Sequence, residues 1–451
     1  MISKKQTFFI LTFIFILCVY TSSYIFSLNF SIYGIILFSF LFNQLLLSIF
    51  NKNNLKNLHF DEKKKINLLI VGYREDPEYW EQCIKSILTQ TITFQTILFS
   101  IDGDEEEDMY MAETARKLIP DSKILLNNHA GKRSAIIHGY RNLQSTYPSD
   151  YIIIIDSDTI LEKNACLELV KCIDSDQKIG CATSNIKIFN IQNLLTKIIN
   201  ARYAYAFNIE RSYLSHLNVM NCCSGPLSIY RSSLITEDFL QKFKNQSFYK
   251  QKIEPGDDRH QTLLIMMNGY KSKMTPYSIC WTECPTQFKR FLRQQLRWMR
   301  SFYREQYWQF KCLTNQPYCL SIIMTYEILF PYLIIGWVLY LFYNPYSSIY
   351  LIAKSFLLTT FIAIIRTVFI VIYTSDVQNL YNVFYLYIYF CSLIPLKVLA
   401  LFTIFDNNWI TSNRLYRRNN LSFDIVLMYS TIVIWNFLLF IGLILNIHSY
   451  I

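Results

Sequence analysis

The chain has 451 residues, of which 52% are hydrophobic and only 17% are charged, whereas ordinary soluble domains carry about 25% charged residues. Its 34 Phe and 33 Tyr, with 11 Gly and 11 Pro, exclude collagen-like, disordered and low-complexity proteins. The net charge is +10, and apolar residues concentrate at both ends around a charged centre. We therefore predict a membrane protein with a central soluble domain, and we attribute much of the positive charge to Lys and Arg retained on the cytosolic side rather than to nucleic-acid binding.

Two apolar stretches open the chain, residues 8–28 and residues 30–50. Each is long enough to cross about 30 Å of hydrocarbon. Lys4 precedes the first stretch and Lys52 follows the second, so the positive-inside rule places both flanks in the cytosol. We predict that residues 1–52 form a hairpin of two transmembrane helices, with a cytosolic domain after it and the protein in the plasma membrane.

Residues 53–285 alternate short apolar runs with amphipathic stretches. The apolar runs predict buried strands at residues 66–71, 96–101, 123–126 and 151–155. The amphipathic stretches predict helices at residues 77–90, 105–118, 132–146 and 162–172. Such alternation is typical of a parallel, Rossmann-like α/β sheet, in which ligands bind at the carboxyl ends of the strands.

The C-terminal part is apolar again. We predict amphipathic interfacial helices over residues 286–316 and membrane helices that form a translocation pore over residues 317–451. Within the latter, spans are expected at residues 318–342, 349–373 and 423–448. The basic stretch 406–420 belongs in the cytosol by the positive-inside rule, which requires an even number of crossings before it. We therefore favour an interfacial or re-entrant segment over a true span for residues 379–405.

Two carboxylates, Asp156 and Asp158, end the strand predicted at residues 151–155. Hard divalent cations take oxygen ligands, so this pair could bind a metal that bridges the diphosphate of a nucleotide sugar. A solvated turn with acidic residues is the alternative, because acidic pairs after strands are common in loops.

A second acidic pair, Asp257 and Asp258, precedes Arg259 and an amphipathic helix. The pair could simply stabilise the N-terminus of that helix, where carboxylates are favourable. Alternatively, one carboxylate could deprotonate an acceptor hydroxyl while Arg259 orients its neighbours.

Gln294, Arg297 and Trp298 lie at positions i, i+3 and i+4, hence on one face of a predicted helix. This face could stack a sugar ring on the indole while the guanidinium binds phosphate oxygens. The same helix could also lie on anionic lipid with its indole at the headgroups, and the two interpretations are compatible.

The motifs together resemble processive family 2 glycosyltransferases. Their order and spacing carry the resemblance, which rests on residues 71–75, 102–103, 131–133, 156–158, 224–227, 256–259 and 294–298. Within that family the chain is most similar to hyaluronan synthases, on residues 222–231, 256–259, 297–305 and 396–414. Chitin and chito-oligosaccharide synthases share most of these motifs, and a polyprenyl-phosphate glycosyltransferase is a further alternative.

The resemblance implies a GT-A glycosyltransferase domain embedded between transmembrane helices. It also implies UDP-N-acetylglucosamine and UDP-glucuronate as donors, Mg²⁺ or Mn²⁺ as cofactor, and a growing polysaccharide and membrane lipid as partners. A chitin-type enzyme would use UDP-N-acetylglucosamine alone. In either case the product would be a β-linked chain formed with inversion at the anomeric carbon.

The resemblance further implies roles for individual residues. Asp258 would be the general base, supported by Asp257 and Arg259. Asp156 and Asp158 would bind the metal and nucleotide, Asp158 being the stronger metal ligand. The other substrate-binding residues would be Tyr73, Glu75, Asp102, Lys132, Arg133, Cys222, Gly225, Gln294, Arg297 and Trp298. Trp409 and Thr411 would form a gate, where Ile410 departs from the glycine usual in the family.

Overall fold

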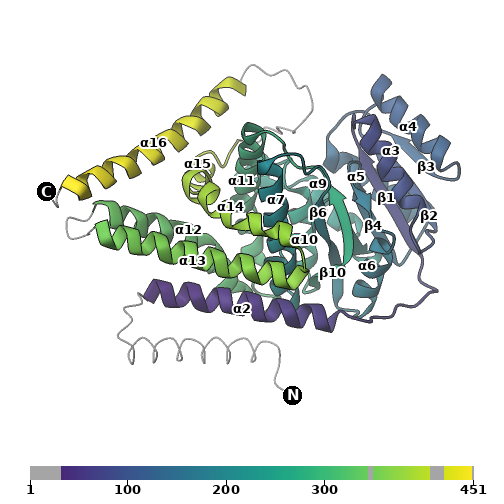
Figure 1. The fold of residues 1–451 in the computed structure, drawn as a ribbon. Coiled ribbons are helices and arrows are strands. Elements are labelled where there is room, and N and C mark those ends of the chain that lie inside the picture. The colour runs from purple at the N-terminus through teal and green to yellow at the C-terminus, as the bar shows by residue number, and fades with distance from the viewer. Residues whose placement is uncertain (1–31, 344–348, 407–420, 449–451) are drawn as a thin grey trace.

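The structure is a computed structural model that describes residues 32–343, 349–406 and 421–448 (Figure 1). The first predicted span and the predicted gate residues Trp409 and Thr411 lie outside these ranges. The central domain is an α/β domain from which long apolar helices extend on one side, as Figure 1 shows for α12, α13 and α16. Its N-terminal region comprises α2 (Ile32–Asn54), β1 (Ile66–Gly72), α3 (Pro77–Leu88), β2 (Thr96–Ile101), α4 (Glu106–Leu118), β3 (Lys123–Leu126), α5 (Lys132–Thr146) and β4 (Tyr151–Asp156).

The strands predicted from the apolar runs are all present within one residue of the expected bounds. Strands β1, β2, β3 and β4 pair in parallel, with β1 between β2 and β4. Every residue of β1 is buried, because helices cover both faces of the sheet. The predicted parallel arrangement is therefore confirmed for this part of the sheet.

The rest of the domain follows β4. Its elements are β5 (Ile160–Leu161), α6 (Ala165–Asp174), β6 (Ile179–Ile188), α7 (Leu194–Tyr205), a π-helix (Ala206–Arg211), α8 (Ser212–His216), β7 (Leu227–Arg231), a 3₁₀ turn (Ser232–Leu234), α9 (Glu237–Lys244), β8 (Ser247–Phe248), β9 (Gln251–Lys252), α10 (Asp257–Met267) and β10 (Lys271–Thr282). Strand β7 is antiparallel to both β4 and β6, and β10 runs parallel to β6. The sheet order is β3-β2-β1-β4-β7-β6-β10-β5. The sheet is therefore mixed, whereas we predicted a parallel sheet.

The sequence pattern missed β6 because polar residues such as Thr183, Ser184 and Asn185 interrupt its apolar run while being buried in the sheet.

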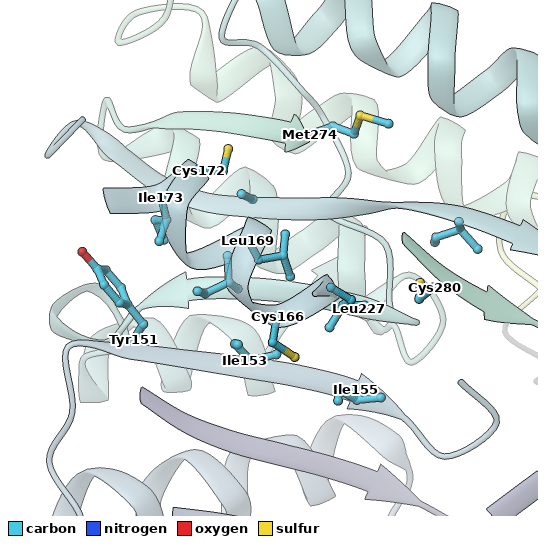
Figure 2. Close-up of a cluster of buried hydrophobic side chains, with 14 of the residues drawn as sticks. Tyr151, Ile153, Ile155, Cys166, Leu169, Cys172, Ile173, Leu227, Met274 and Cys280 are labelled. Carbon is cyan, nitrogen blue, oxygen red and sulfur yellow. The ribbon is translucent and has the colours of Figure 1, made fainter. Parts of the chain in front are cut away.

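The side chains of the strands alternate between two layers of helices. On one face, Leu68 and Ile70 pack with α3, α4 and α6, and on the other, Leu69 and Val71 pack with α5, α9 and α10. Figure 2 shows the first layer where Ile153 of β4 faces Leu169 of α6. This double covering holds β4 rigidly, and the motif Asp156-Ser-Asp158 is at its carboxyl end.

Helix α11 (Phe288–Cys312) connects the domain to the apolar helices α12 (Cys319–Tyr343), α13 (Ile349–Thr374), α14 (Asn382–Ile388), α15 (Ile394–Phe402) and α16 (Leu421–His448). A 3₁₀ turn (Val377–Tyr381) precedes α14 and a π-helix (Tyr389–Leu393) follows it. Among the described residues, four helical segments are long and apolar enough to cross a membrane: Cys319–Tyr343, Ile349–Thr374, Val377–Phe402 and Ile425–Ile447. The third segment is the one for which we favoured an interfacial position. Its length and composition also suit a span, so its placement stays a prediction.

Helix α11 also holds the segment that leads out of α15. Arg300 donates to Thr403 Oγ1 at 2.9 Å and pairs with Asp406 at 2.6 Å. Arg304 donates to the carbonyl oxygens of Ile404 and Asp406, both at 3.0 Å. Two arginines one turn apart thus fix the segment after α15 to the helix that carries Gln294 and Arg297.

Candidate active site

The carboxylate of Asp102, at the end of β2, shapes the loop before α5. It is almost fully buried and accepts hydrogen bonds from the backbone amides of Ala130 and Gly131, each at 3.0 Å. His129 Nδ1 lies 3.0 Å from the same carboxylate, and the His129 ring stacks on Tyr73 with 4.4 Å between ring centroids. Asp102 therefore positions a flat aromatic pair beside the carboxyl ends of β1 and β2.

Lys132, in the first turn of α5, lies between the two predicted acidic pairs. Its ammonium is 2.6 Å from Asp156 Oδ1 and 3.6 Å from Asp257 Oδ2. Burial disfavours its charge, but the carboxylates outweigh burial and raise the pKa of Lys132. Burial also raises the pKa of Asp156, against the opposing effect of Lys132. The structure thus brings together acidic motifs that lie about a hundred residues apart in the sequence.

Gly225 closes this pair from the loop before β7. A Cβ at this position would lie 2.7 Å from Asp156 Oδ2 and 3.2 Å from Lys132 Nζ. Any side chain at residue 225 would therefore displace one of the two charged groups. Glycine is required here because the backbone of residue 225 comes close to Asp156 and Lys132, not because its backbone dihedral angles are unusual.

The neighbours of Asp156 extend the site toward β1. Glu75 Oε2 accepts a hydrogen bond from Ser157 Oγ at 2.7 Å, which joins the loop after β1 to the loop after β4. Arg74, between Tyr73 and Glu75, has a φ of +43°, a backbone conformation that is rare outside glycine. This turn directs Tyr73 toward His129, while Glu75 contacts Ser157.

Asp156 and Asp158 are the only predicted metal ligands. Among the described residues, no group of three or more His, Cys, Asp or Glu side chains could hold a metal. Mg²⁺ is usually bound through one or two protein carboxylates, with waters and substrate phosphates completing its shell. The two aspartates at the end of β4 therefore fit a metal that binds together with a diphosphate, not a metal caged by protein alone.

The second acidic pair occupies the first turn of α10. Gly256 precedes it with a φ of +96°, and a Cβ there would collide with Ser301 Oγ of α11. Asp258 Oδ1 accepts from the Arg259 amide at 2.7 Å, and Asp258 Oδ2 accepts from the Cys222 thiol at 3.4 Å. Asp257 faces Lys132, so the two neighbouring carboxylates have different partners.

Burial raises the pKa of the Cys222 thiol to about 12. The thiol is therefore a neutral hydrogen-bond donor to Asp258 near neutral pH, and it contributes no negative charge of its own.

The residues predicted to share a face of α11 have different surroundings. Arg297 is half-buried, and burial lowers its pKa, with Asp257 and Asp258 acting in the opposite direction. Its guanidinium thus belongs to the electrostatic environment of the acidic pair. Trp298 is 40% exposed and Gln294 is half-buried.

Arg133, predicted to bind substrate, makes intramolecular contacts instead. It is buried and donates to the Phe243 carbonyl at 2.8 Å, to Gln246 Oε1 at 2.7 Å and to the Glu254 carbonyl at 3.3 Å. Its guanidinium also lies 4.5 Å from the centroid of the Phe243 ring. These contacts fix the segment that leads into α10, and the structure does not bring Arg133 into the group formed by Lys132, Asp156 and Asp257.

The structure adds residues that the sequence pattern did not indicate. Arg211, at the end of the π-helix, donates to Ser224 Oγ and to the Cys222 carbonyl, so it holds the loop beside Asp258. Glu327 of α12 accepts a hydrogen bond at 3.3 Å from Asn221, the residue directly before Cys222 in the chain. An ionisable residue within an apolar span is itself a signal of function, and Glu327 could have been found in that way.

The comparisons with known proteins identify the family of the chain. Residues 64–301, more than half of the chain, match the model of a family described as glycosyltransferase like family 2. Hyaluronan synthase 2 of Homo sapiens is 30% identical over 441 residues, which cover 87% of this chain and 78% of that protein. Hyaluronan synthase 3 of Xenopus laevis is 28% identical over 428 residues, which cover 86% of this chain and 75% of that protein.

Among solved structures, a mannosyltransferase from Pyrobaculum calidifontis in complex with GDP-Man and Mn²⁺ aligns with a TM-score of 0.43 and 13% identity, over 90% of this chain and 94% of that chain. The predicted family is confirmed by the family model and the curated relatives, and the predicted fold class is confirmed with it. The chain therefore belongs to family 2 of the glycosyltransferases and is a processive, GT-A-type membrane enzyme homologous to the hyaluronan synthases.

Proposed function

We propose that this protein polymerises N-acetylglucosamine and glucuronate from their UDP donors into a β-linked polysaccharide of the hyaluronan type, and exports it across the plasma membrane. The observation that carries the proposal is the position of Lys132 between Asp156 and Asp257. One ammonium group joins the predicted donor site to the predicted acceptor site, within a chain homologous to hyaluronan synthases.

The donor half of the proposed site lies at the ends of β1, β2 and β4. Tyr73, stacked on His129, offers an aromatic face to the uracil, and Glu75 and Asp102 shape the loops around it. Lys132 provides positive charge for the diphosphate. Asp156 and Asp158 would hold Mg²⁺ or Mn²⁺, which when bound neutralises charge on the departing diphosphate.

Asp258 is the proposed general base. Its carboxylate takes the proton of the acceptor hydroxyl while that oxygen forms a bond to the anomeric carbon of the donor sugar. The bond from the anomeric carbon to the diphosphate oxygen breaks, and UDP leaves with the electron pair. Attack from the opposite face in one displacement inverts the α-linked donor to a β-linked product. The Cys222 thiol and the Arg259 amide hold the carboxylate for this step.

The acceptor and the product occupy the side of α10 and α11 in this proposal. Arg297, which shares the electrostatic environment of Asp257 and Asp258, binds phosphate or acceptor oxygens, and Gln294 and Trp298 complete the mouth of the passage. A polar polymer cannot cross bare hydrocarbon, so the C-terminal helices must supply polar contacts along its path. Trp409 and Thr411 are the proposed gate, and the catalytic domain faces the cytosol.

Sugar incorporation by purified protein in detergent with Mg²⁺ or Mn²⁺ tests this proposal. We expect polymer only when UDP-N-acetylglucosamine and UDP-glucuronate are both present, and we expect hyaluronidase to degrade it. Polymer from UDP-N-acetylglucosamine alone, degraded by chitinase, would replace the hyaluronan proposal with a chitin-type enzyme. Transfer of a single sugar to a polyprenyl phosphate, without polymer, would contradict both.

A further inference from the structure

A buried carboxylate and imidazole pair joins α10 to α11, the two helices that carry the proposed acceptor residues. Glu305 of α11 and His260 of α10 are both fully buried, and His260 Nδ1 lies 3.2 Å from Glu305 Oε2. Glu305 Oε1 accepts a second hydrogen bond, from Gln246 Nε2. Since an ionised carboxylate can only accept, the His260 hydrogen is assigned to Nδ1. Burying a carboxylate is costly unless it is hydrogen-bonded, and these two donors satisfy Glu305.

The pair connects the helices that carry the proposed chemistry. His260 follows Asp258 by two residues in the first turn of α10, and Glu305 lies eight residues after Arg297 on α11. The two helices are in close contact at this point, because a Cβ on Gly256 would collide with Ser301 Oγ. A displacement of Glu305 would therefore change the separation between Asp258 and Arg297.

The same network reaches the start of α5. Gln246, which donates to Glu305, accepts a hydrogen bond from Arg133 at 2.7 Å, and Arg133 directly follows Lys132. Glu305, on α11 with Arg297, is thus linked by hydrogen bonds to α10, which carries Asp258, and through Gln246 to α5, which carries Lys132. Aromatic rings enclose the pair, since Trp308 lies edge-on to His260 with 4.8 Å between ring centroids.

We propose that Glu305 is a positioning residue, which acts through His260 and Gln246 to hold Asp258 in register with Arg297 and Lys132. The proposal rests on the proposed function, because it takes Asp258 as the base. Displacing a reacting group by 1 Å can lower a rate by about a hundredfold. Glu305 should therefore affect the rate of transfer much more than the binding of the nucleotide, which the ends of β1, β2 and β4 provide.

The test compares Glu305→Gln, His260→Leu and His260→Asn in the full-length detergent-solubilised protein. Glutamine at residue 305 keeps the shape of the side chain, but its amide nitrogen then faces one of the two donors, Gln246 Nε2 or His260 Nδ1. Leucine at residue 260 removes the imidazole donor. An Asn amide nitrogen can replace Nδ1–H. We expect kcat to fall about 10- to 100-fold in Glu305→Gln and His260→Leu, and to stay within about threefold in His260→Asn, with the Kd of UDP within about twofold in all three.

The matched control is Tyr151→Phe. It removes a partly buried hydrogen bond to a carboxylate, from Tyr151 Oη to Asp174 Oδ1 at 2.6 Å, at the opposite end of β4. We expect it to lower the melting temperature about as much as Glu305→Gln and to leave kcat within about twofold. The control separates a general loss of stability from a loss of positioning.

Wild-type kcat in Glu305→Gln, or a failure of His260→Asn to retain activity when His260→Leu loses it, would overturn the positioning role. Loss of kcat in Tyr151→Phe equal to that in Glu305→Gln would also overturn it. The proposed function would survive these results. Undiminished transfer by Asp258→Asn is the separate result that would remove Asp258 as base, whatever the behaviour of Glu305.

Discussion

The donor half and the acceptor half of the site are built in different ways. In the donor half, Asp102 directly follows β2 and Asp156 ends β4, two strands of the parallel part of the sheet, and Lys132 begins α5, which connects β3 to β4. In the acceptor half, Asp258 lies on α10 and Arg297 on α11. Contacts between distant segments join this half together, as between Cys222 of the loop before β7 and Asp258, or between Asn221 and Glu327. A sheet edge positions ligands through local chain order. Packed helices position them only through long-range contacts, which makes the acceptor half more sensitive to substitutions outside it.

The two halves also differ in electrostatics. Around Asp156, the Lys132 ammonium group lies between two carboxylates. This arrangement suits an anionic diphosphate, which the ammonium group and a bound metal ion would hold together. Around Asp258 the hydrogen-bond donors are a neutral thiol and a backbone amide, and positive charge comes from more distant groups such as the Arg297 guanidinium. Asp156 is paired with Lys132, and we therefore assign the role of base to Asp258, which the thiol and the amide hold in place.

The largest effect is expected from Asp258→Asn. It removes the proton acceptor, and we expect transfer to fall by about 10²- to 10⁴-fold while the Kd of UDP changes little. Radiolabelled sugar incorporation and UDP calorimetry on the same preparation measure both quantities. Undiminished incorporation would show that Asp258 is not the base, and that the acceptor half does not supply it.

The next largest effect is expected from Lys132→Met, which leaves Asp156 and Asp257 facing each other without a cation. We expect transfer to fall by about a hundredfold and, in contrast to Asp258→Asn, UDP affinity to fall with it. Lys132→Arg is the matched control and should retain more affinity. Unchanged UDP binding in Lys132→Met would place Lys132 outside the donor half.

The pH dependence of the Lys132 pair follows from its raised pKa. A lysine whose pKa is raised on folding contributes stability that is present below its ordinary value of 10.5 and is lost only as the pH rises above that value. UDP affinity should therefore show no loss attributable to Lys132 up to about pH 10. A loss near pH 8 that disappears in Lys132→Arg would contradict this assignment.

A smaller effect is expected from Gly225→Ala. The added methyl group would lie 2.7 Å from Asp156 Oδ2 and must displace it or the Lys132 ammonium. We expect the KM for the UDP donors to rise about tenfold with a small change in melting temperature. Gly336→Ala, where no atom lies within 4 Å of the added Cβ, is the matched control. Equal kinetics in both variants would show that the Asp156 pair tolerates displacement.

The smallest effect is expected from alkylation of Cys222. Burial raises the pKa of its thiol to about 12, and the thiolate is the reactive form, so iodoacetamide at pH 8 should modify it very slowly. Mass spectrometry of the peptide and residual activity follow the reaction, with Cys222→Ala as the control. Rapid modification at Cys222 would show that the acceptor half is more open than its packing indicates.

Much of the donor half could be predicted from the sequence, because local patterns determine it. The apolar runs of β1 and β4 are short, continuous and followed by acidic residues, which indicates buried strands with ligands at their ends. Arg133 was the exception in this half. The family resemblance implied that Arg133 binds substrate, whereas its guanidinium donates to the Phe243 and Glu254 carbonyls and to Gln246.

The sequence by itself determined the parallel strands, the acidic motifs and the long apolar segments, because each is encoded by residues close together in the chain. It also determined the family, because the order and spacing of short motifs along the chain carry that resemblance. The tertiary structure alone decided which groups meet. It placed Lys132 between Asp156 and Asp257, made β7 antiparallel, and brought Glu305 to His260. The physical reason is that hydrogen bonds and ion pairs between distant segments depend on how helices and strands pack, and no local pattern of residue types records that packing.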